Sequence, residues 1–178
     1  MRMGTGDLVG ARTAISGLQH RFARVRGAEH PDAAVCAHNL AVCLRTAGEA
    51  DEALTTATRT VQWLGEQLGD THPYTLCGRL TLANVLGDLR QLDKAEQLSR
   101  SCAAALRDRV GDNHPDTLIA YLGVAVTLRS LGHMSEAGRL RDRAVAAFAK
   151  RLGEAHAWTA AARGWQRIDR DLEPLLPA

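Results

Sequence analysis

The seven histidines of this 178-residue sequence are the side chains best suited to metal binding or proton transfer. An imidazole nitrogen can coordinate a transition metal or act as a general base near neutral pH. Three of the seven, His20, His38 and His133, follow no common spacing. The other four stand in a Gly-x-x-His phrase that recurs every 42 residues: His30, His72, His114 and His156. The chemistry open to them therefore depends on what repeats at that interval.

Equivalent side chains in successive units of a helical repeat cannot share a metal ion. Neighbouring packed helices lie about 8 to 10 Å apart, whereas a Zn–N bond measures about 2 Å. We therefore interpret the four phased histidines as turn residues that bond to local backbone groups, and we predict no metal site. The sequence also contains no G-x-x-x-x-G-K-[ST], H-E-x-x-H or G-x-S-x-G motif. We predict no enzymatic activity and no cofactor.

The 42-residue period is typical of a solenoid, in which each unit buries its apolar face by stacking on its neighbours. We predict one array over residues 1–178. Its expected parts are a partial N-terminal repeat (1–26), three full repeats (27–68, 69–110 and 111–152), and a partial repeat with a C-terminal cap (153–178).

Each unit carries two runs of apolar residues at helical spacing, which predicts a pair of antiparallel helices. A glycine such as Gly69 follows the second helix of one unit, and proline then opens the first helix of the next at a position that needs no amide donor. Gly48 and Gly132 mark the turn inside the unit, while the second unit has Arg90 there, which predicts a strained or altered turn. The expected fold class is all-α, with about eight helices.

Composition and charge favour some kinds of partner over others. The residues are 46% hydrophobic but only 4% aromatic, and 22 basic against 20 acidic residues leave a formal charge of +2. Such a balance gives no electrostatic reason to expect nucleic acid or an anionic membrane. No apolar run is long enough for a membrane helix and no secretory signal is visible, so we expect a cytoplasmic protein with its four cysteines reduced.

Small residues 12 positions apart, such as Ala41 and Ala53, recur in each helix-turn-helix unit with a leucine before the first. This pattern resembles the tetratricopeptide repeat. The 42-residue length and the G-x-x-H-P phrase are similar to the kinesin-light-chain type, which is also widespread in bacterial proteins. The resemblance implies a right-handed α-α superhelix, whose concave face is lined by the first helices and holds an extended peptide or a partner's helix.

Carrying the family's groove positions over column by column implies a binding face with a mostly apolar floor. An exposed apolar stripe on a soluble protein marks an interaction site. The alternative is that part of the stripe is ordinary core or is covered by the chain's own tail. The implied groove residues are Val35, His38, Asn39, Val42, Arg45, Cys77, Leu80, Asn84, Asp88, Ile119, Leu122, Val126 and Arg129.

The chain departs from the family pattern just before the repeated Leu-Ala pair. Kinesin-light-chain repeats often place asparagine there, but the three units read His38-Asn39, Leu80-Thr81 and Leu122-Gly123. Only the first unit keeps the asparagine. A ladder of asparagines on a peptide backbone is therefore not expected, and a more hydrophobic ligand is favoured.

The remaining surfaces are expected to be solvated or terminal. A basic stretch including Arg100, Arg107, Arg139, Arg141 and Arg143 is interleaved with acidic residues and predicts a convex face with salt bridges; nucleic-acid binding is the weaker alternative. Residues 157–172 are expected to form a capping helix, with Gln166 and Arg170 on its polar outer face.

Two functions remain open for this array. The first is a non-enzymatic scaffold or adaptor that binds a peptide or a partner helix in its concave groove. The second is a regulatory sensor array of a bacterial STAND signalling system, acting with an ATPase in trans. The unpaired apolar helix of the N-terminal half-repeat adds an expectation of homodimerisation or of docking onto a partner at that end.

Overall fold

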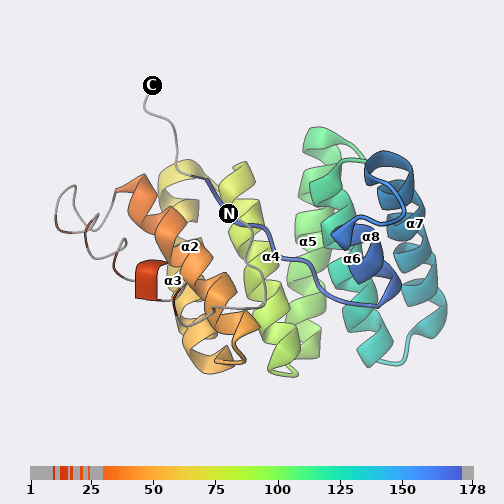
Figure 1. Ribbon diagram of the computed structural model, residues 1–178, viewed down its shortest axis with the longest axis horizontal. Coiled ribbons are helices and arrows are strands. Elements are labelled where there is room, and N and C mark those ends of the chain that lie inside the picture. The colour runs from red at the N-terminus through yellow and green to blue at the C-terminus, as the bar shows by residue number, and fades with distance from the viewer. Residues whose placement is uncertain are drawn as a thin grey trace. The chain divides into compact units, whose positions relative to one another are not determined.

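The computed structural model describes residues 10, 13–15, 17, 21, 24 and 30–173. The regular structure among them is helical, with no strand, which confirms the all-α class (Figure 1). Most of the predicted partial N-terminal repeat lies outside the described residues. Its predicted role in homodimerisation or docking therefore stays a prediction. The helices are α2 (Pro31–Thr46), α3 (Ala50–Leu68), α4 (Pro73–Asp88), α5 (Leu92–Val110), α6 (Pro115–Ser130), α7 (Met134–Leu152) and α8 (Ala157–Arg163).

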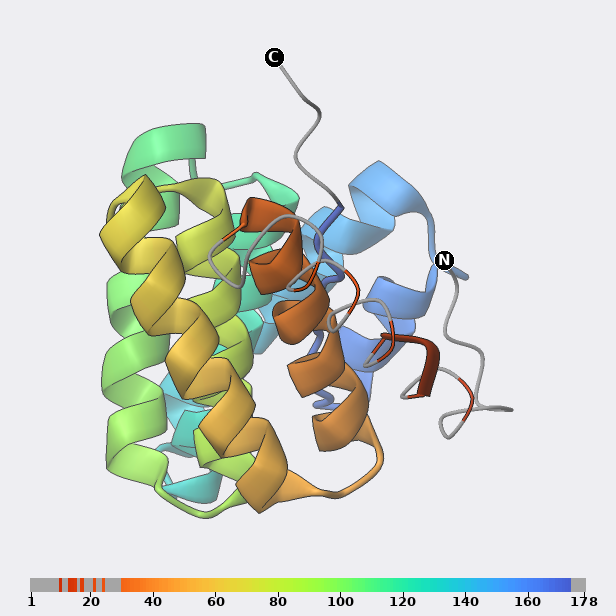
Figure 2. The same cartoon turned by 90° about the vertical axis from the view of Figure 1, so that its left-hand side faces the viewer.

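The chain divides into two compact units, and in each of them helices adjacent in sequence pack together. The first unit holds α2, α3 and α4 up to Val85, together with residues 170–173; α2 lies along α3 (Figures 1 and 2). The hydroxyl of Thr75 on α4 donates to the Leu64 carbonyl of α3 over 3.1 Å. The second unit covers residues 86–169, and in it α5 packs on α6, α6 on α7, and α7 on α8.

Alanines line the places where helix backbones come close. Ala41 and Ala53, which are 12 residues apart in the first helix pair, both have no exposed surface. A side chain this small lets two helices approach without forcing neighbours off their rotamers. The equivalent alanines of the later pairs are also fully buried: Ala83, Ala95, Ala125 and Ala137.

The turn inside each helix pair uses a residue in the left-handed region. Gly48 and Gly132 have φ of 83° and 87°, and Arg90 occupies the same position with φ of 61°. The amide of the next residue bonds back to the carbonyl five residues earlier in all three turns, as from Gln91 to Leu86 over 2.9 Å. The turn type is therefore kept in the second pair, and the strain predicted there falls on the Arg90 backbone.

The phased histidines cap the first helix of each pair. The Nδ1 atom of each ring accepts a hydrogen bond from the backbone amide two residues later, over 3.1 to 3.2 Å. His114, for example, receives the Asp116 amide while Pro115 fills the first helical position. The imidazole thus accepts the hydrogen bond from a first-turn amide that a Ser or Asp side chain usually accepts at a helix start. The interpretation of these histidines as residues that bond local backbone is confirmed.

The predicted capping helix over 157–172 is wrong, because α8 ends at Arg163. Trp165 adopts φ of 57°, and the Gln166 amide bonds to the Ala161 carbonyl over 2.8 Å, which closes the helix end. A bulky residue is a genuine outlier in this region. Tertiary contacts hold it there, since the indole packs against the buried Val124 and Leu128. Residues 166–173 consequently follow a non-helical path.

Candidate functional site

The implied groove positions lie on α2, α4 and α6, but most of them are buried. The expectation of an exposed apolar stripe is therefore wrong. Asn39, Arg45, Cys77 and Val126 are half-buried. Those with less than a tenth of their surface exposed are Val35, His38, Val42, Leu80, Asn84, Ile119 and Leu122. Asp88 and Arg129 are exposed.

Some of these positions contact the chain itself, through residues 164–173 after α8, which we call the docked segment. In the first unit, the Asn39 side chain binds the backbone of Leu172 in both directions. Its Nδ2 donates to the Leu172 carbonyl over 3.0 Å, and its Oδ1 accepts from the Leu172 amide over 2.9 Å. This pairing resembles one residue pair of a β ladder, and it involves only the backbone of Leu172. The Leu172 side chain is itself buried. Asn39 thus clamps a peptide backbone.

Further side chains of α2 and α4 bind the same stretch. The His38 Nε2 lies 2.8 Å from the Arg170 carbonyl oxygen, and since a carbonyl can only accept, this nitrogen carries the proton. The Tyr74 hydroxyl donates to the Glu173 carbonyl over 2.8 Å. The Cys77 thiol also points toward the Arg170 carbonyl, with a 3.8 Å separation. Three carbonyls of residues 170–173 are therefore held by side chains of the first helices.

Electrostatics in the first unit reflect this close approach. Burial, followed by the nearby Glu173 carboxylate, raises the pKa of the Tyr74 hydroxyl. Burial, followed by the Asp171 carboxylate, raises the pKa of the Cys43 thiol. Burial and Asp32 raise the pKa of the Cys36 thiol in the same way. The two thiols are kept in their neutral form, which is the unreactive one.

In the second unit, Arg167 of the docked segment contacts residues of α4 and α6. Arg167 Nη2 donates to the Thr127 hydroxyl over 2.8 Å, and Nη1 lies 3.4 Å from the Gly123 carbonyl. The guanidinium also lies against the backbone of Gly87. A Cβ built on Gly87 would overlap Nη2 and would come within 2.6 Å of Cζ. The absence of a side chain at position 87 thus makes room for Arg167.

Contacts of the Trp165 ring with two arginines hold the start of the docked segment. The guanidinium carbons of Arg129 and Arg141 lie 4.8 and 5.2 Å from the centre of the Trp165 ring. Such cation–π contacts stabilise by about 0.5 to 1 kcal/mol at partly exposed positions. Arg129, one of the implied groove residues, therefore contacts the chain's own indole. Arg141, expected on a solvated face, does the same and is partly buried.

Sequence reasoning missed Tyr74, Gly87, Gly123 and Thr127. A signal for three of them is present in the aligned repeats. Gly87 occupies the repeat position that holds Arg45 in the first repeat and Arg129 in the third. Gly123 occupies the position that holds Asn39 in the first repeat. Thr127 falls in a column that otherwise holds Cys43 and Val85. These departures from the repeat coincide with the contacts of Arg167. Tyr74 has no comparable signal.

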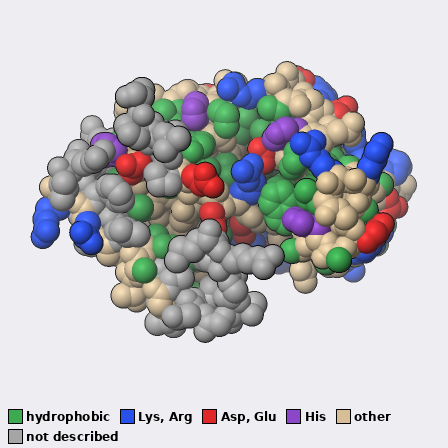
Figure 3. All heavy atoms as spheres, turned by 45° about the horizontal axis from the view of Figure 1, so that its top comes forward, with side chains coloured by type: hydrophobic (Ala, Val, Ile, Leu, Met, Phe, Trp, Pro, Cys, Tyr) green, Lys and Arg blue, Asp and Glu red, His purple; other side chains and the backbone are tan. Residues whose placement is uncertain are grey.

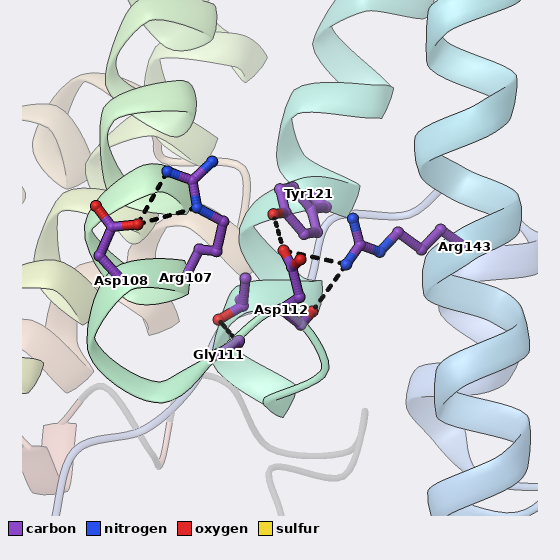
Figure 4. A network of polar contacts seen from close by, with 7 residues as sticks. Arg107, Asp108, Gly111, Asp112, Tyr121 and Arg143 are labelled. Atoms are coloured by element: carbon purple, nitrogen blue, oxygen red, sulfur yellow. Dashed lines mark hydrogen bonds and ion pairs between the residues drawn. The ribbon is translucent and has the colours of Figure 1, made fainter.

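The basic stretch is largely paired with carboxylates. Arg100 bonds to Glu96 and Glu136, both over 2.8 Å. Figure 4 shows Arg143 of α7 reaching the Asp112 carboxylate, which also accepts from the Tyr121 hydroxyl over 2.6 Å. On the face shown in Figure 3, hydrophobic side chains surface in separate groups among charged ones. The predicted salt bridges are thus present, on neighbouring helices as well as within one.

No group of three or more His, Cys, Asp or Glu side chains in the described part of the chain is arranged to hold a metal ion. No helix there has both the length and the apolar character needed to cross a bilayer.

Comparison with known proteins supports the family resemblance. Residues 79–116 match a family model described as a tetratricopeptide repeat. A protein of Podosopora anserina, described as a kinesin light chain with nearly identical TPR-like repeats, has a TM-score of 0.71 at 24% identity, over 90% of this chain and 76% of that one. The chain has the fold of a TPR-like repeat array.

Other solved structures share the fold of the array. A second structure of the Podosopora anserina protein has a TM-score of 0.70, also at 24% identity, with the same coverage of both chains. BtubC (BKLC) from P. vanneervenii has a TM-score of 0.64 at 13% identity; the match covers 87% of the array and 61% of that chain. A search of curated proteins found no match. The consecutive helix pairs of this chain are therefore similar in fold to the TPR-like repeats of these structures.

Proposed function

We propose that the array is a non-enzymatic scaffold whose first helices bind a non-helical segment of a partner protein. Tetratricopeptide repeats generally mediate protein–protein interactions, and the family is generally without enzymatic activity. The observation that carries the proposal is the two-way bond between Asn39 and the backbone of Leu172. A side chain that grips a backbone in this manner accepts many sequences, as a binding groove must.

The proposal treats the docked segment as the groove's present occupant. A partner segment would take its place and use the same groups: the Asn39 amide, the His38 Nε2–H and the Tyr74 hydroxyl. The implied groove residues on the first helices of the first unit would then line the site together with these three. Burial of the apolar members beneath an occupant is expected, since a groove filled by a peptide loses its solvent.

The test uses a fluorescein-labelled peptide that copies residues 164–173, titrated by fluorescence anisotropy. The chain's own segment competes at a high effective concentration, so binding to the wild-type chain should be weak. The variant Arg167→Ala/Leu172→Ala, here called the opened chain, should bind the peptide at least about tenfold more tightly. Adding Asn39→Ala to the opened chain should abolish the gain. Equal, negligible binding to all three chains would refute the proposal.

A pull-down with the opened chain and with its Asn39→Ala variant distinguishes the scaffold from the STAND alternative. A sensor array that acts with an ATPase in trans would retain a nucleotide-binding protein whether or not Asn39 is intact. We expect a groove-dependent protein or peptide partner instead, and we expect neither nucleic acid nor a membrane as partner. The paired arginines of the basic stretch support this expectation, because neutralised charges attract polyanions weakly.

A further inference from the structure

We propose that Gly87, Gly123 and Thr127 form a subsite for an arginine side chain, so that the preferred ligand is a non-helical segment containing an arginine. This inference rests on the proposed function, because it specifies a side chain that the bound partner segment carries. Arg167 of the docked segment now occupies the subsite.

The subsite has the groups that a guanidinium needs. The Thr127 hydroxyl donates to the Gly123 carbonyl over 3.0 Å, which directs its lone pairs toward the Arg167 Nη2 at 2.8 Å. Thr127 is fully buried, so its oxygen is pre-positioned rather than solvated. Nη1 approaches the Gly123 carbonyl at the same time. A planar fork with two donors fits these two acceptors, and a single ammonium does not.

Charge at the end of α4 also favours an arginine. The carbonyl end of a helix attracts cations, and α2 and α6 supply their own with Arg45 and Arg129 in the last turn. Helix α4 has no basic residue in its last turn, where Gly87 stands in the equivalent column. The cation that the other first helices carry in their own sequence is therefore delivered to α4 by the bound segment.

The glycine at position 87 makes this exchange possible. It lies inside a helix, where glycine is a poor choice compared with alanine. Any Cβ there would overlap the Arg167 guanidinium. Gly138 on α7 offers a matched contrast, because a Cβ built on it meets no atom within 4 Å. Position 87 is thus shaped for a guanidinium, and position 138 is not.

The residue after the arginine adds an aliphatic preference. Ile168 has only 7% of its surface exposed, although it lies in a non-helical stretch of the docked segment. We therefore expect the preferred partner segment to carry arginine followed by a large aliphatic residue. The subsite, which lies within the second unit, supplies this sequence preference.

The test compares two peptides on the opened chain: the copy of residues 164–173, and the same peptide with alanine at the position of Arg167. We expect the arginine peptide to bind at least about tenfold more tightly. Gly87→Ala in the opened chain should remove that difference, whereas Gly138→Ala should keep it. A lysine at the same position should recover only a minor part of the affinity.

The outcomes distinguish the two proposals. If both peptides bind equally and still require Asn39, the arginine subsite is wrong and the scaffold proposal stands. If neither peptide binds any chain, the scaffold proposal itself fails. Should the opened chain not fold by circular dichroism, the two peptides are compared on the wild-type chain at higher concentration. Equal affinities there would also overturn the subsite.

Discussion

Replacing Gly87 with alanine tests most directly whether the Arg167 guanidinium is seated against α4. Alanine in a helix interior is favoured over glycine by about 0.8 to 1 kcal/mol. At an open position the substitution should therefore stabilise the protein. Gly138→Ala on α7 is that open case, since the added Cβ meets nothing within 4 Å. We expect it to raise the free energy of unfolding by up to about 1 kcal/mol.

At position 87 the same substitution should be neutral or destabilising. The new Cβ would displace Arg167 and break its bond to the Thr127 hydroxyl. A hydrogen bond to a charged group contributes about 1.5 to 3 kcal/mol, and Arg167 is only partly buried, so we use the lower half of that range. Because both variants gain the same helix propensity, the expected gap between them is the lost bond, about 1.5 to 2.2 kcal/mol.

Urea unfolding of the full chain, followed by circular dichroism, measures this gap, with constant m-values as the check that the transition is unchanged. Arg167→Ala completes a double-mutant cycle, because it removes the group that the Cβ would meet. In that background Gly87→Ala should stabilise the chain as much as Gly138→Ala does. If Gly87→Ala is already as stabilising as Gly138→Ala in the wild-type chain, Arg167 is not seated as described and the subsite argument fails.

Three further predictions concern single contacts. Arg90→Gly should stabilise the chain by about 1 kcal/mol in urea unfolding, because the left-handed backbone is strained for arginine; an unchanged midpoint would contradict this. His114→Ala should cost about 1 kcal/mol and His114→Asp much less, and equal losses would refute a capping role. The Tyr121 hydroxyl, followed by Arg143, lowers the pKa of Asp112, so this carboxylate stabilises the fold above its ordinary pKa. Asp112→Asn should therefore cost stability at neutral pH, and the difference from wild type should vanish as pH falls through the lowered value.

Local rules explain what could be predicted from sequence. The helix starts, the left-handed turns and the capping histidines each depend on a few adjacent residues, and each recurs every 42 positions. Arg90 replaces the glycine of the other two turns in the sequence, and its positive φ agrees with the strain predicted there. The placement of the implied groove residues on first helices follows from the same periodicity. Their burial does not, because it depends on residues far along the chain.

The docked segment was missed because two patterns compete after residue 157. Gln166 and Arg170 fall where an outer polar face of a capping helix would lie, so periodicity favours continued helix. Gly164 is the helix-stop signal, but the decisive residue is Trp165, which no local rule places in the left-handed region. Its packing on Val124 and its contact with Arg129 are tertiary, and they override helix propensity.

Comparison of the repeats separates what folds the array from what a bound segment contacts. Buried alanines and turn residues are nearly constant from repeat to repeat, because any change there damages packing. The docked segment contacts positions that differ between repeats. The position of Asn39 is glycine in the third repeat, and the position held by Arg45 and Arg129 is glycine at residue 87. Glycine at position 87 gives up about 0.8 to 1 kcal/mol of helix propensity, and seating a guanidinium offsets that loss. An occupant that merely covered the face would need no such glycine, so the site is matched to an arginine.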